Sequence, residues 1–409
     1  MTQRTYDPAR IFVRGGGIAE GIEWAFWLAI TVYWIVELEL GPLQLVMLGV
    51  VLEGSVLLAE TPTGVVADVY SRKRSLIISQ FVMGLGFIIA VVSTNYWIVL
   101  PAQAIFGVGW TFRSGADTAW VTDELKGIGD VDDDDIERLL LRKHRFGMVV
   151  GVGSLLFTMV VGTAFGVRWA AAAMGLAAIG LGFYYLQAMR EDHFTPGHEH
   201  ERGFVETLRG GIAAVSGRPR LRVLVLVILV FEMGSDGFDR LGFKHFLDNG
   251  GYDDDSLIAL GVLFVILALA GLAVNHVASG VLDAGHGVAR LAVGLLALAT
   301  IGGLIVAVTN IVIVIAVGYM IQDSVREALW PTLEGWANRD APTEVRATVH
   351  SLMGQTTAIA ELFGGLMLGL LAEATSIQVS LVAAAVLWAM GAAIATRGVA
   401  PKAKVAEPG

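Results

Sequence analysis

Acidic side chains interrupt several long apolar stretches of the sequence, where they could bind protons. Glu53, Glu232 and Glu361 each lie near the middle of such a stretch, with no basic residue within one helical turn along the chain. Burial in an apolar medium disfavours the charged form of a carboxyl group. We therefore predict that each of the three binds and releases a proton; the alternative is a permanently protonated acid that only packs helices together.

Other acids stand at helical spacing from bases. Arg113 and Asp117 are four residues apart, and Arg326 follows Asp323 by three, so a salt bridge is expected within each helix. Glu232, Asp236 and Asp239 recur along one stripe, where Arg240 could neutralise one of them. Such charges either line a polar pathway or fix helix packing. The candidate substrate contacts are Glu23, Trp27, Tyr33, Arg113, Asp236, Asp323, Arg326 and Glu327; the candidate proton-binding residues are Glu232, Glu53, Glu361 and Asp117.

Trp27 and Tyr33 belong to an aromatic-rich stretch that also contains Glu23. Rings beside an acid suit a cationic or aromatic ligand. Aromatic residues near the ends of a membrane span more often form the belt at the lipid–water interface. Both interpretations remain open for this stretch.

Membrane helices must position these groups. Hydrophobic residues make up 55% of the 409 and charged residues 16%, whereas soluble proteins have about 25% charged residues. A helix needs about 20 apolar residues to cross a bilayer, and twelve such runs are present. They lie near 15–38, 43–67, 75–93, 96–122, 145–166, 168–189, 221–246, 257–279, 288–308, 311–336, 346–372 and 377–396. The sequence predicts an all-α membrane protein.

The runs form two sets of six, over residues 1–189 and 221–409, joined by a linker at 190–220 in which 203–217 is expected to form an amphipathic helix. A second amphipathic surface helix is expected after the acidic turn at 132–135. If the N-terminus is inside, 23 of the 28 Lys and Arg residues fall on the inner side, as the positive-inside rule requires. We expect a protein of the plasma membrane with both termini in the cytoplasm.

The connection at 61–75 concentrates charge between the second and third runs. Gly64, Asp68, Arg72 and Lys73 resemble the loop G-x-x-x-D-[RK]-x-G-[RK]-[RK] that follows helix two in the major facilitator superfamily. Val69 replaces the usual base of that pattern, and a serine replaces its glycine. Twelve spans in two sets of six, with a long central connection, extend the resemblance over the whole chain.

This resemblance implies an inner latch. Asp68 would face the start of helix eleven, near 345–347, where a helix N-terminus stabilises an anion, and Arg72 would pair with Asp123. Together with Gly64 and Lys73, these residues would hold the two halves together on the cytoplasmic side in one state. The positive-inside rule alone accounts for the bases but not for the acid.

The resemblance also implies that helices one, four, seven and ten line a central cavity while three, six, nine and twelve face lipid. Helices three, six, nine and twelve contain no internal charge, which fits this division. An internal repeat is predicted from helices four and ten, because the segment 114–124 aligns with 324–334 at an offset of 210 residues. That alignment pairs Asp117 with Glu327.

The predicted function is secondary active transport, with proton-coupled efflux of a small amphipathic or cationic compound favoured over proton-coupled uptake. Lipid transport or a non-transporting sensor are weaker alternatives. Gly147, Gly151 and Gly153 lack the proline of the drug-antiporter signature on helix five, which leaves the direction of transport open. A small-molecule substrate, protons and the lipid bilayer are the expected partners of a monomer.

Enzymatic activity is not expected. The only protease-like motif, at 127–130, ends at Asp130 in a charged connection, and no ATP-binding loop is present. There are no cysteines, and His193, His198 and His200 fit a solvated loop better than a metal site. Neither a cofactor, beyond the proton gradient as energy source, nor a nucleic-acid partner is expected.

Overall fold

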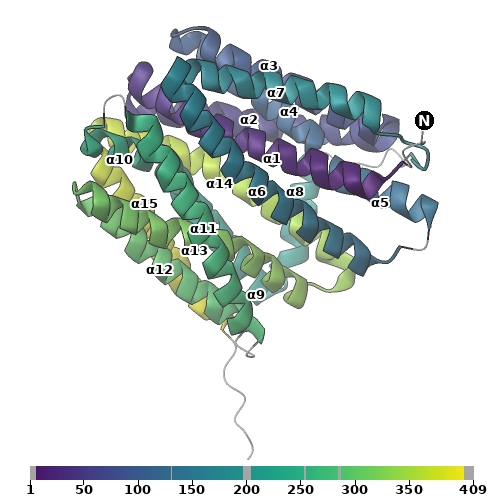
Figure 1. Ribbon diagram of the computed structural model, residues 1–409. Helices are drawn as coiled ribbons and strands as arrows, with labels where there is room; N and C mark the ends of the chain where they lie inside the picture. Colours follow the sequence, from purple (N-terminus) through teal and green to yellow (C-terminus); the bar gives the residue numbers. More distant parts are fainter. Residues whose placement is uncertain (1–5, 130, 197–203, 253–254, 284–286, 400–409) are drawn as a thin grey trace, which may run out of the picture. The chain divides into compact units, whose positions relative to one another are not determined.

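The computed structural model describes residues 6–129, 131–196, 204–252, 255–283 and 287–399, and all regular secondary structure within these ranges is helical (Figure 1). The chain divides into two compact units. The first comprises Met1–Gly203 and Gly250–Ile266, and the second Phe204–Asn249 and Leu267–Gly409. The predicted bundles at 1–189 and 221–409 lie mainly in the first and second unit respectively.

The first unit contains the first six predicted spans. Their helices are α1 (Pro8–Val32) with η1 (Tyr33–Glu37), α2 (Pro42–Val65) with η2 (Val66–Tyr70), α3 (Arg72–Val92), α4 (Tyr96–Arg113) with α5 (Ala116–Ile128), α6 (Asp133–Phe165) and α7 (Val167–Ala188). The segments η1 and η2 are π-helical.

The second unit begins with α8 (Phe204–Ser216), the amphipathic helix expected in the linker, which packs against α14. The remaining helices are α9 (Pro219–Gly237) with the π-helical η3 (Phe238–Gly242) and α10 (Phe243–Gly250), α11 (Ser256–Asp283), α12 (Val288–Val308), α13 (Val312–Asp340), α14 (Arg346–Ala374) and α15 (Ile377–Ala395). The first part of α11 belongs to the first unit.

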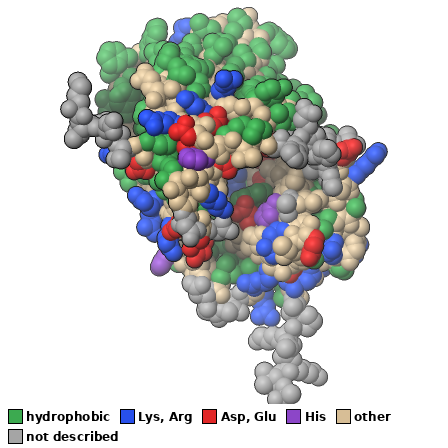
Figure 2. Space-filling view, turned by 90° about the vertical axis from the view of Figure 1, so that its right-hand side faces the viewer, with side chains coloured by type: hydrophobic (Ala, Val, Ile, Leu, Met, Phe, Trp, Pro, Cys, Tyr) green, Lys and Arg blue, Asp and Glu red, His purple; other side chains and the backbone are tan. Residues whose placement is uncertain are grey.

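Within the described residues, nine helices are long and apolar enough to cross a membrane. The other three predicted spans correspond to α4 with α5, to α9 with its continuation, and to α13. These three carry Arg113, Asp236 and Arg326 among other charged residues, which lowers their hydropathy. Figure 2 shows hydrophobic side chains covering the upper part of its view, with charged side chains gathered below them.

Two predicted elements differ from the structure. The fourth span is broken between α4 and α5, because Gly115 adopts a left-handed conformation (φ 72°) that ends the regular helix. The amphipathic helix expected after 132–135 is not separate, because α6 starts at Asp133 and continues to Phe165. Asp132 caps it by accepting the Asp135 backbone N–H, so the acidic turn is the N-terminus of the fifth span.

Small residues bring α1 and α6 together. A Cβ atom on Gly17 would meet Phe146 and the Gly147 backbone, and one on Gly21 would meet Val150. A Cβ atom on Gly147 would overlap the Glu20 carboxylate. Glycines on both helices therefore allow the close approach that membrane helices use in place of a hydrophobic driving force.

The internal repeat has a different register from the predicted one. Arg72 begins α3 and Val288 begins α12, 216 residues later, and both helices have 21 residues. Tyr96 begins α4 and Val312 begins α13 at the same offset. A tightly packed glycine and its two backbone neighbours on the next helix recur at this offset: Gly86 with Ala102 and Phe106, and Gly302 with Gly318 and Gln322.

The predicted pairing of Asp117 with Glu327 is therefore wrong. Asp117 lies 21 residues beyond the start of α4, but Glu327 lies only 15 beyond the start of α13. The offset falls to 210 only for the last pair of helices, where Val167 begins α7 and Ile377 begins α15. The local similarity of 114–124 to 324–334 is thus coincidental in helix register.

Candidate functional site

A buried ion-pair group connects α1, α4, α5 and α6 in the first unit. Arg113, at the end of α4, contacts both carboxylate oxygens of Glu23 on α1, with Nη2 3.0 Å from Oε2. The side chains of Arg113 and Glu23 are only 15% and 10% exposed. The Arg113 guanidinium also lies 4.5 Å from the centre of the Trp110 ring. Paired charges of this kind are the form in which arginine is tolerated away from water.

The predicted salt bridge between Arg113 and Asp117 is absent. Asp117 instead binds Lys143 of α6, with 2.6 Å between Oδ2 and Nζ, and Glu20 of α1 lies 4.0 Å from the same Nζ. The break at Gly115 removes the continuous helical turn that would place Arg113 and Asp117 on one face. Lys143 was missed in the sequence because its stretch was assigned to a surface connection rather than to a span.

A second group surrounds Arg326 of α13 in the second unit. Its two terminal nitrogens lie 2.7 and 2.8 Å from the carboxylate oxygens of Asp239 in η3. Asp323 is 3.8 Å away, so the predicted local pair is present but secondary to Asp239. Arg326 also interacts electrostatically with Glu232 of α9. One guanidinium thus holds acids from two helices.

Asp236 of α9 lies beside this group. Its Oδ1 accepts a hydrogen bond of 2.8 Å from Nε of Arg240, as the sequence predicted. Its Oδ2 is buried and has no hydrogen-bond partner among the described residues. Asp236 therefore carries one satisfied and one unsatisfied carboxylate oxygen in a site that is only 8% exposed.

Glu232, Glu53 and Glu361 are not isolated acids. Each makes a polar or electrostatic interaction in the structure, so the expectation that they lack compensation is wrong. The base that acts on Glu232 comes from another helix, which spacing along one helix does not reveal. Glu232 is buried at 8% exposure, whereas Glu53 and Glu361 are half-buried.

The aromatic candidates on the first helix pack internally. Tyr33 is fully buried and its hydroxyl donates to the Ser93 carbonyl, 3.2 Å away. Trp27 contacts the rings of Trp34 and Phe106 edge-on. Tyr33 thus stabilises the packing of η1 against the end of α3, which contradicts its assignment as a substrate contact.

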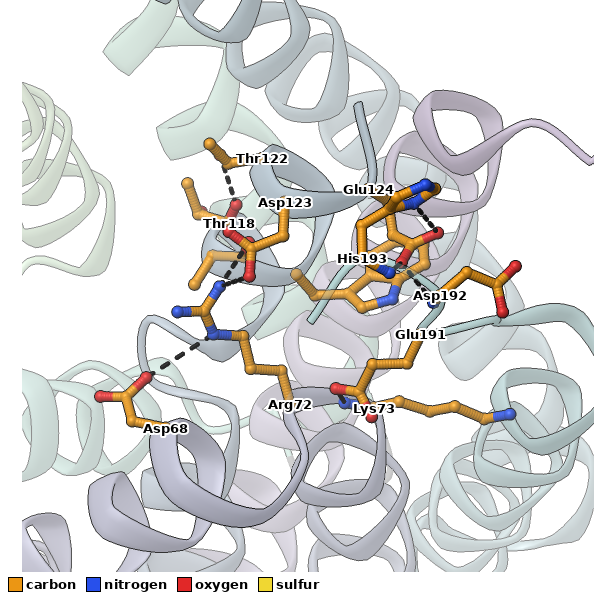
Figure 3. A network of polar contacts seen from close by, with 12 residues as sticks. Asp68, Arg72, Lys73, Thr118, Thr122, Asp123, Glu124, Glu191, Asp192 and His193 are labelled. Atoms are coloured by element: carbon orange, nitrogen blue, oxygen red, sulfur yellow. Dashed lines mark hydrogen bonds and ion pairs between the residues drawn. The ribbon is translucent and has the colours of Figure 1, made fainter. Parts of the chain in front are cut away.

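The inner ion-pair network is assembled within the first unit (Figure 3). Arg72 contacts Asp123 as predicted, its Nη1 donates to the Ala119 carbonyl at 3.0 Å, and its Nε lies 3.6 Å from Asp68. Gly64 precedes Asp68 by one helical turn on α2. The predicted contact of Asp68 with the start of α14 would join the two units, and it stays a prediction.

The start of α3 is capped by Glu191, which sequence reasoning missed. Its carboxylate accepts the Lys73 backbone N–H at 3.0 Å and the Ser71 hydroxyl at 2.5 Å. An anion is favoured at a helix N-terminus. Ser71, which departs from the superfamily pattern, is therefore the N-cap that holds Glu191. No local motif marks Glu191, because it is 120 residues from its partner.

Glu124 at the inner end of α5 ties down the chain that follows α7. It is 1% exposed and accepts the backbone N–H groups of Asp192 and His193 at 2.8 and 3.0 Å. The Tyr6 hydroxyl donates to it at 3.0 Å, and burial together with the Glu124 charge raises the pKa of Tyr6. The Trp120 indole donates to the Arg190 carbonyl at 2.7 Å.

The second unit has a counterpart at the 216-residue offset. Trp336 is fully buried beside Gly398, and its indole donates to Asp340 at 2.8 Å. Asp340 also lies 3.0 Å from Nε of Arg220, just inside the start of α9. In each unit, a tryptophan and an acid four residues later connect the inner end of the fourth helix to the start of the first and the end of the sixth.

Replacing Glu124 by alanine is expected to destabilise the first unit. The change would leave two backbone donors and the Tyr6 hydroxyl without their acceptor, at a cost of about 1–3 kcal/mol for each buried group left unsatisfied. The melting temperature of the detergent-purified protein should fall by several degrees. Glu137→Ala on the exposed side of α6 is the matched control. Equal melting temperatures for the two variants would contradict the role given to Glu124.

Among the described residues, no group of three or more His, Asp or Glu side chains is placed to hold a metal ion. His198, His200 and Asp130, which the sequence had raised as candidates for metal binding or protease-like chemistry, lie outside the described residues. The polar groups of the structure are thus ion pairs and carboxyl clusters.

Comparison with known proteins identifies the family. A sequence profile described as Major Facilitator Superfamily matches residues 145–365, more than half of the chain. The chain belongs to the major facilitator superfamily. It is a secondary transporter of this type, and its chain forms an integral membrane protein. A comparison with curated protein sequences gives no significant match.

Solved structures of the transporter's relatives agree in fold. The nucleoside transporter NupG, as a D323A mutant, has a TM-score of 0.79 at 12% identity, over 95% of this chain and 99% of that one. A bacterial homologue of the human lysosomal transporter Spinster has a TM-score of 0.75 at 12% identity, over 96% and 97%. A POT family transporter in complex with a peptide conjugate has a TM-score of 0.70 at 13% identity, over 95% and 94%.

Proposed function

We propose that this transporter exports a small amphipathic or cationic compound in exchange for protons, by alternating access. The observation that carries the proposal is the excess of carboxyl groups in the second unit. Glu232, Asp236, Asp239 and Asp323 surround only two bases, Arg240 and Arg326. Four carboxylates and two guanidinium groups cannot balance in a buried site unless a proton or another cation is bound.

Competition for this excess charge supplies the coupling. Like charges that share a buried site bind protons as a coupled set, and burial favours their protonated form. A substrate cation that enters the site would stabilise the ionised carboxylates and release a proton. By linkage, protons then weaken the binding of the substrate by the same factor, which is the requirement for exchange.

Asp236 is the best placed member of the set to carry the proton. Its Oδ2 has no hydrogen-bond partner among the described residues, while Arg240 satisfies only Oδ1. Asp239 differs because both of its oxygens accept from Arg326. Glu232 is the reserve, since it is equally buried and lies within electrostatic range of Arg326. Glu53, Glu361 and Asp117 are further candidates from the sequence.

The proposal places the protein in the plasma membrane as a monomer, with both termini in the cytoplasm. The distribution of Lys and Arg along the chain supports this orientation. The proton gradient would be its only energy source, without a cofactor or nucleic-acid partner. Proton-coupled uptake is the second candidate, and it uses the same carboxyl groups with the opposite linkage between proton and substrate.

Proton release on substrate binding separates the two candidates. The purified protein in weakly buffered detergent solution would be mixed with amphipathic cations that raise its melting temperature, such as ethidium or tetraphenylphosphonium, while a pH indicator is followed. An exchanger should release protons as the cation binds. A cotransporter should take up protons instead, and no proton movement with any stabilising compound would contradict coupling at this site.

The inner latch gives a separate prediction. Asp68→Asn should leave the protein in the membrane, slow transport and shift its population away from the outward-facing state, because Asp68 would no longer hold the start of α14. The chain has no cysteine, so spin labels at Tyr70→Cys and Glu344→Cys report the distance across the inner side. We expect longer distances in Asp68→Asn than in the control Asp135→Asn. Identical distance distributions would rule out the latch.

A further inference from the structure

An apolar groove of about 470 Å³ lies between α11 and α12 in the second unit. Its lining comes from residues 273–281 of α11 and 290–298 of α12, and it contains one charged side chain, Arg290. Small residues create the space: Ala273 and Ala278 face it from α11 and Gly294 from α12. A Cβ atom on Gly294 would meet nothing within 4 Å. The groove is separate from the carboxyl cluster around Arg326.

Arg290 marks the end of the groove that lies at the membrane surface. It stands in the first turn of α12, two residues after Val288, and it is exposed. No acidic side chain of the described residues forms an ion pair with it. Leu298, at the far end of the lining, is eight residues further along α12, or about 12 Å at 1.5 Å per residue. The groove therefore runs from the surface into the hydrocarbon region.

We propose that this groove binds an anionic phospholipid, with an acyl chain along α12 and its phosphate on Arg290. The apolar lining and the single unpaired base match the two parts of such a lipid. The base stands at the depth of the headgroups, and one Arg near an anionic membrane surface gives about a fivefold preference for the charged lipid. A neutral lipid or an apolar solute would fill the groove without using Arg290.

The side chains at the edge of the groove suit a direct measurement. Val277 lines it and is 63% exposed, while Val308, at the other end of α12, is 73% exposed and does not line it. Because the chain has no cysteine, a single fluorophore can be attached at Val277→Cys or at Val308→Cys. The labelled transporter is reconstituted in vesicles that contain phosphatidylglycerol or phosphatidylcholine brominated on the acyl chains.

Quenching of the label at position 277 should be about fivefold more efficient with brominated phosphatidylglycerol than with brominated phosphatidylcholine. Arg290→Gln should reduce this ratio to about one, and Arg290→Lys, which keeps the charge, should retain most of it. The label at position 308 should show no preference. Equal ratios at positions 277 and 308, or a ratio that survives Arg290→Gln, would overturn the proposal.

Filling the groove gives the complementary test. Gly294→Leu places a side chain in open space, so it should exclude the lipid and reduce quenching at position 277 by both lipids. Gly153→Leu is the matched control, because a Cβ atom on Gly153 also meets nothing within 4 Å but lies on α6 in the first unit. Unchanged quenching in Gly294→Leu would show that the lipid does not occupy this groove.

Discussion

Asp236→Asn is expected to abolish proton release on cation binding and to remove the response of transport to a pH gradient. Asparagine keeps the size of the side chain and one oxygen for Arg240, but it cannot bind and release a proton. A coupling free energy of about 1–3 kcal/mol corresponds to a change of about 5- to 150-fold in affinity between protonation states. This pH dependence of binding should disappear, while downhill exchange of the cation continues.

The matched control for this change is Asp248→Asn. Asp248 also lies on the seventh predicted span, pairs with a base four residues away and is 45% exposed. It should leave proton release unaltered. Glu232→Gln tests the reserve site in the same assay. If Asp236→Asn releases protons as fully as the unmodified protein, the proton is carried elsewhere.

Glu23→Gln is expected to have the largest effect on stability. Arg113 and Glu23 are both nearly buried and form a paired contact between α4 and α1. Removing one partner of a buried ion pair costs about 3–5 kcal/mol, because the other charge remains without compensation. The melting temperature and the yield of folded protein in detergent should both fall sharply.

The double variant Glu23→Gln/Arg113→Gln separates charge from packing. If the cost of the single change comes from the uncompensated guanidinium, removing that guanidinium should recover most of the lost melting temperature. Asp135→Asn is the surface control, since its pair with Arg138 is exposed and contributes about 0–1 kcal/mol. A double variant that is less stable than Glu23→Gln would contradict this explanation.

The class of protein could be predicted from the sequence because hydropathy and charge are local properties. Runs of about 20 apolar residues define the spans, and the signature residues Asp68 and Arg72 indicate the superfamily. The contact of Arg72 with Asp123 was predicted as well, because the superfamily pattern places an acid at the inner end of helix four. The positions of these groups depend on the helix ends, which residue type and spacing mark well.

Partners that come from different helices could not be predicted. Lys143, which binds Asp117, and Glu191, which caps α3, are distant in the sequence from the groups that they contact. The pair of Arg113 and Asp117 was predicted on the assumption of a continuous helix, and one left-handed glycine at 115 removes that assumption. Spacing along one helix gives the face of a side chain but not the neighbour opposite it.

The register of the internal repeat shows a related difficulty. A tryptophan and an acid occur in both 114–124 and 324–334, and their similarity favoured an offset of 210 residues. The equivalent clamps in the structure are instead Trp120 with Glu124 and Trp336 with Asp340, at 216. Backbone contacts such as those of Gly86 and Gly302 fix the offset, and only the folded chain reveals them.

The most direct test of the account is cation flux in proteoliposomes with an imposed proton gradient. Vesicles containing the transporter would be loaded with a stabilising cation from the melting-temperature screen, and the external pH would be changed at zero membrane potential. We predict that a proton gradient drives the cation against its own concentration gradient, with protons moving in the opposite direction, and that Asp236→Asn moves the cation only downhill. Uphill movement of the cation together with protons, or flux that does not respond to the gradient, would contradict proton-coupled export.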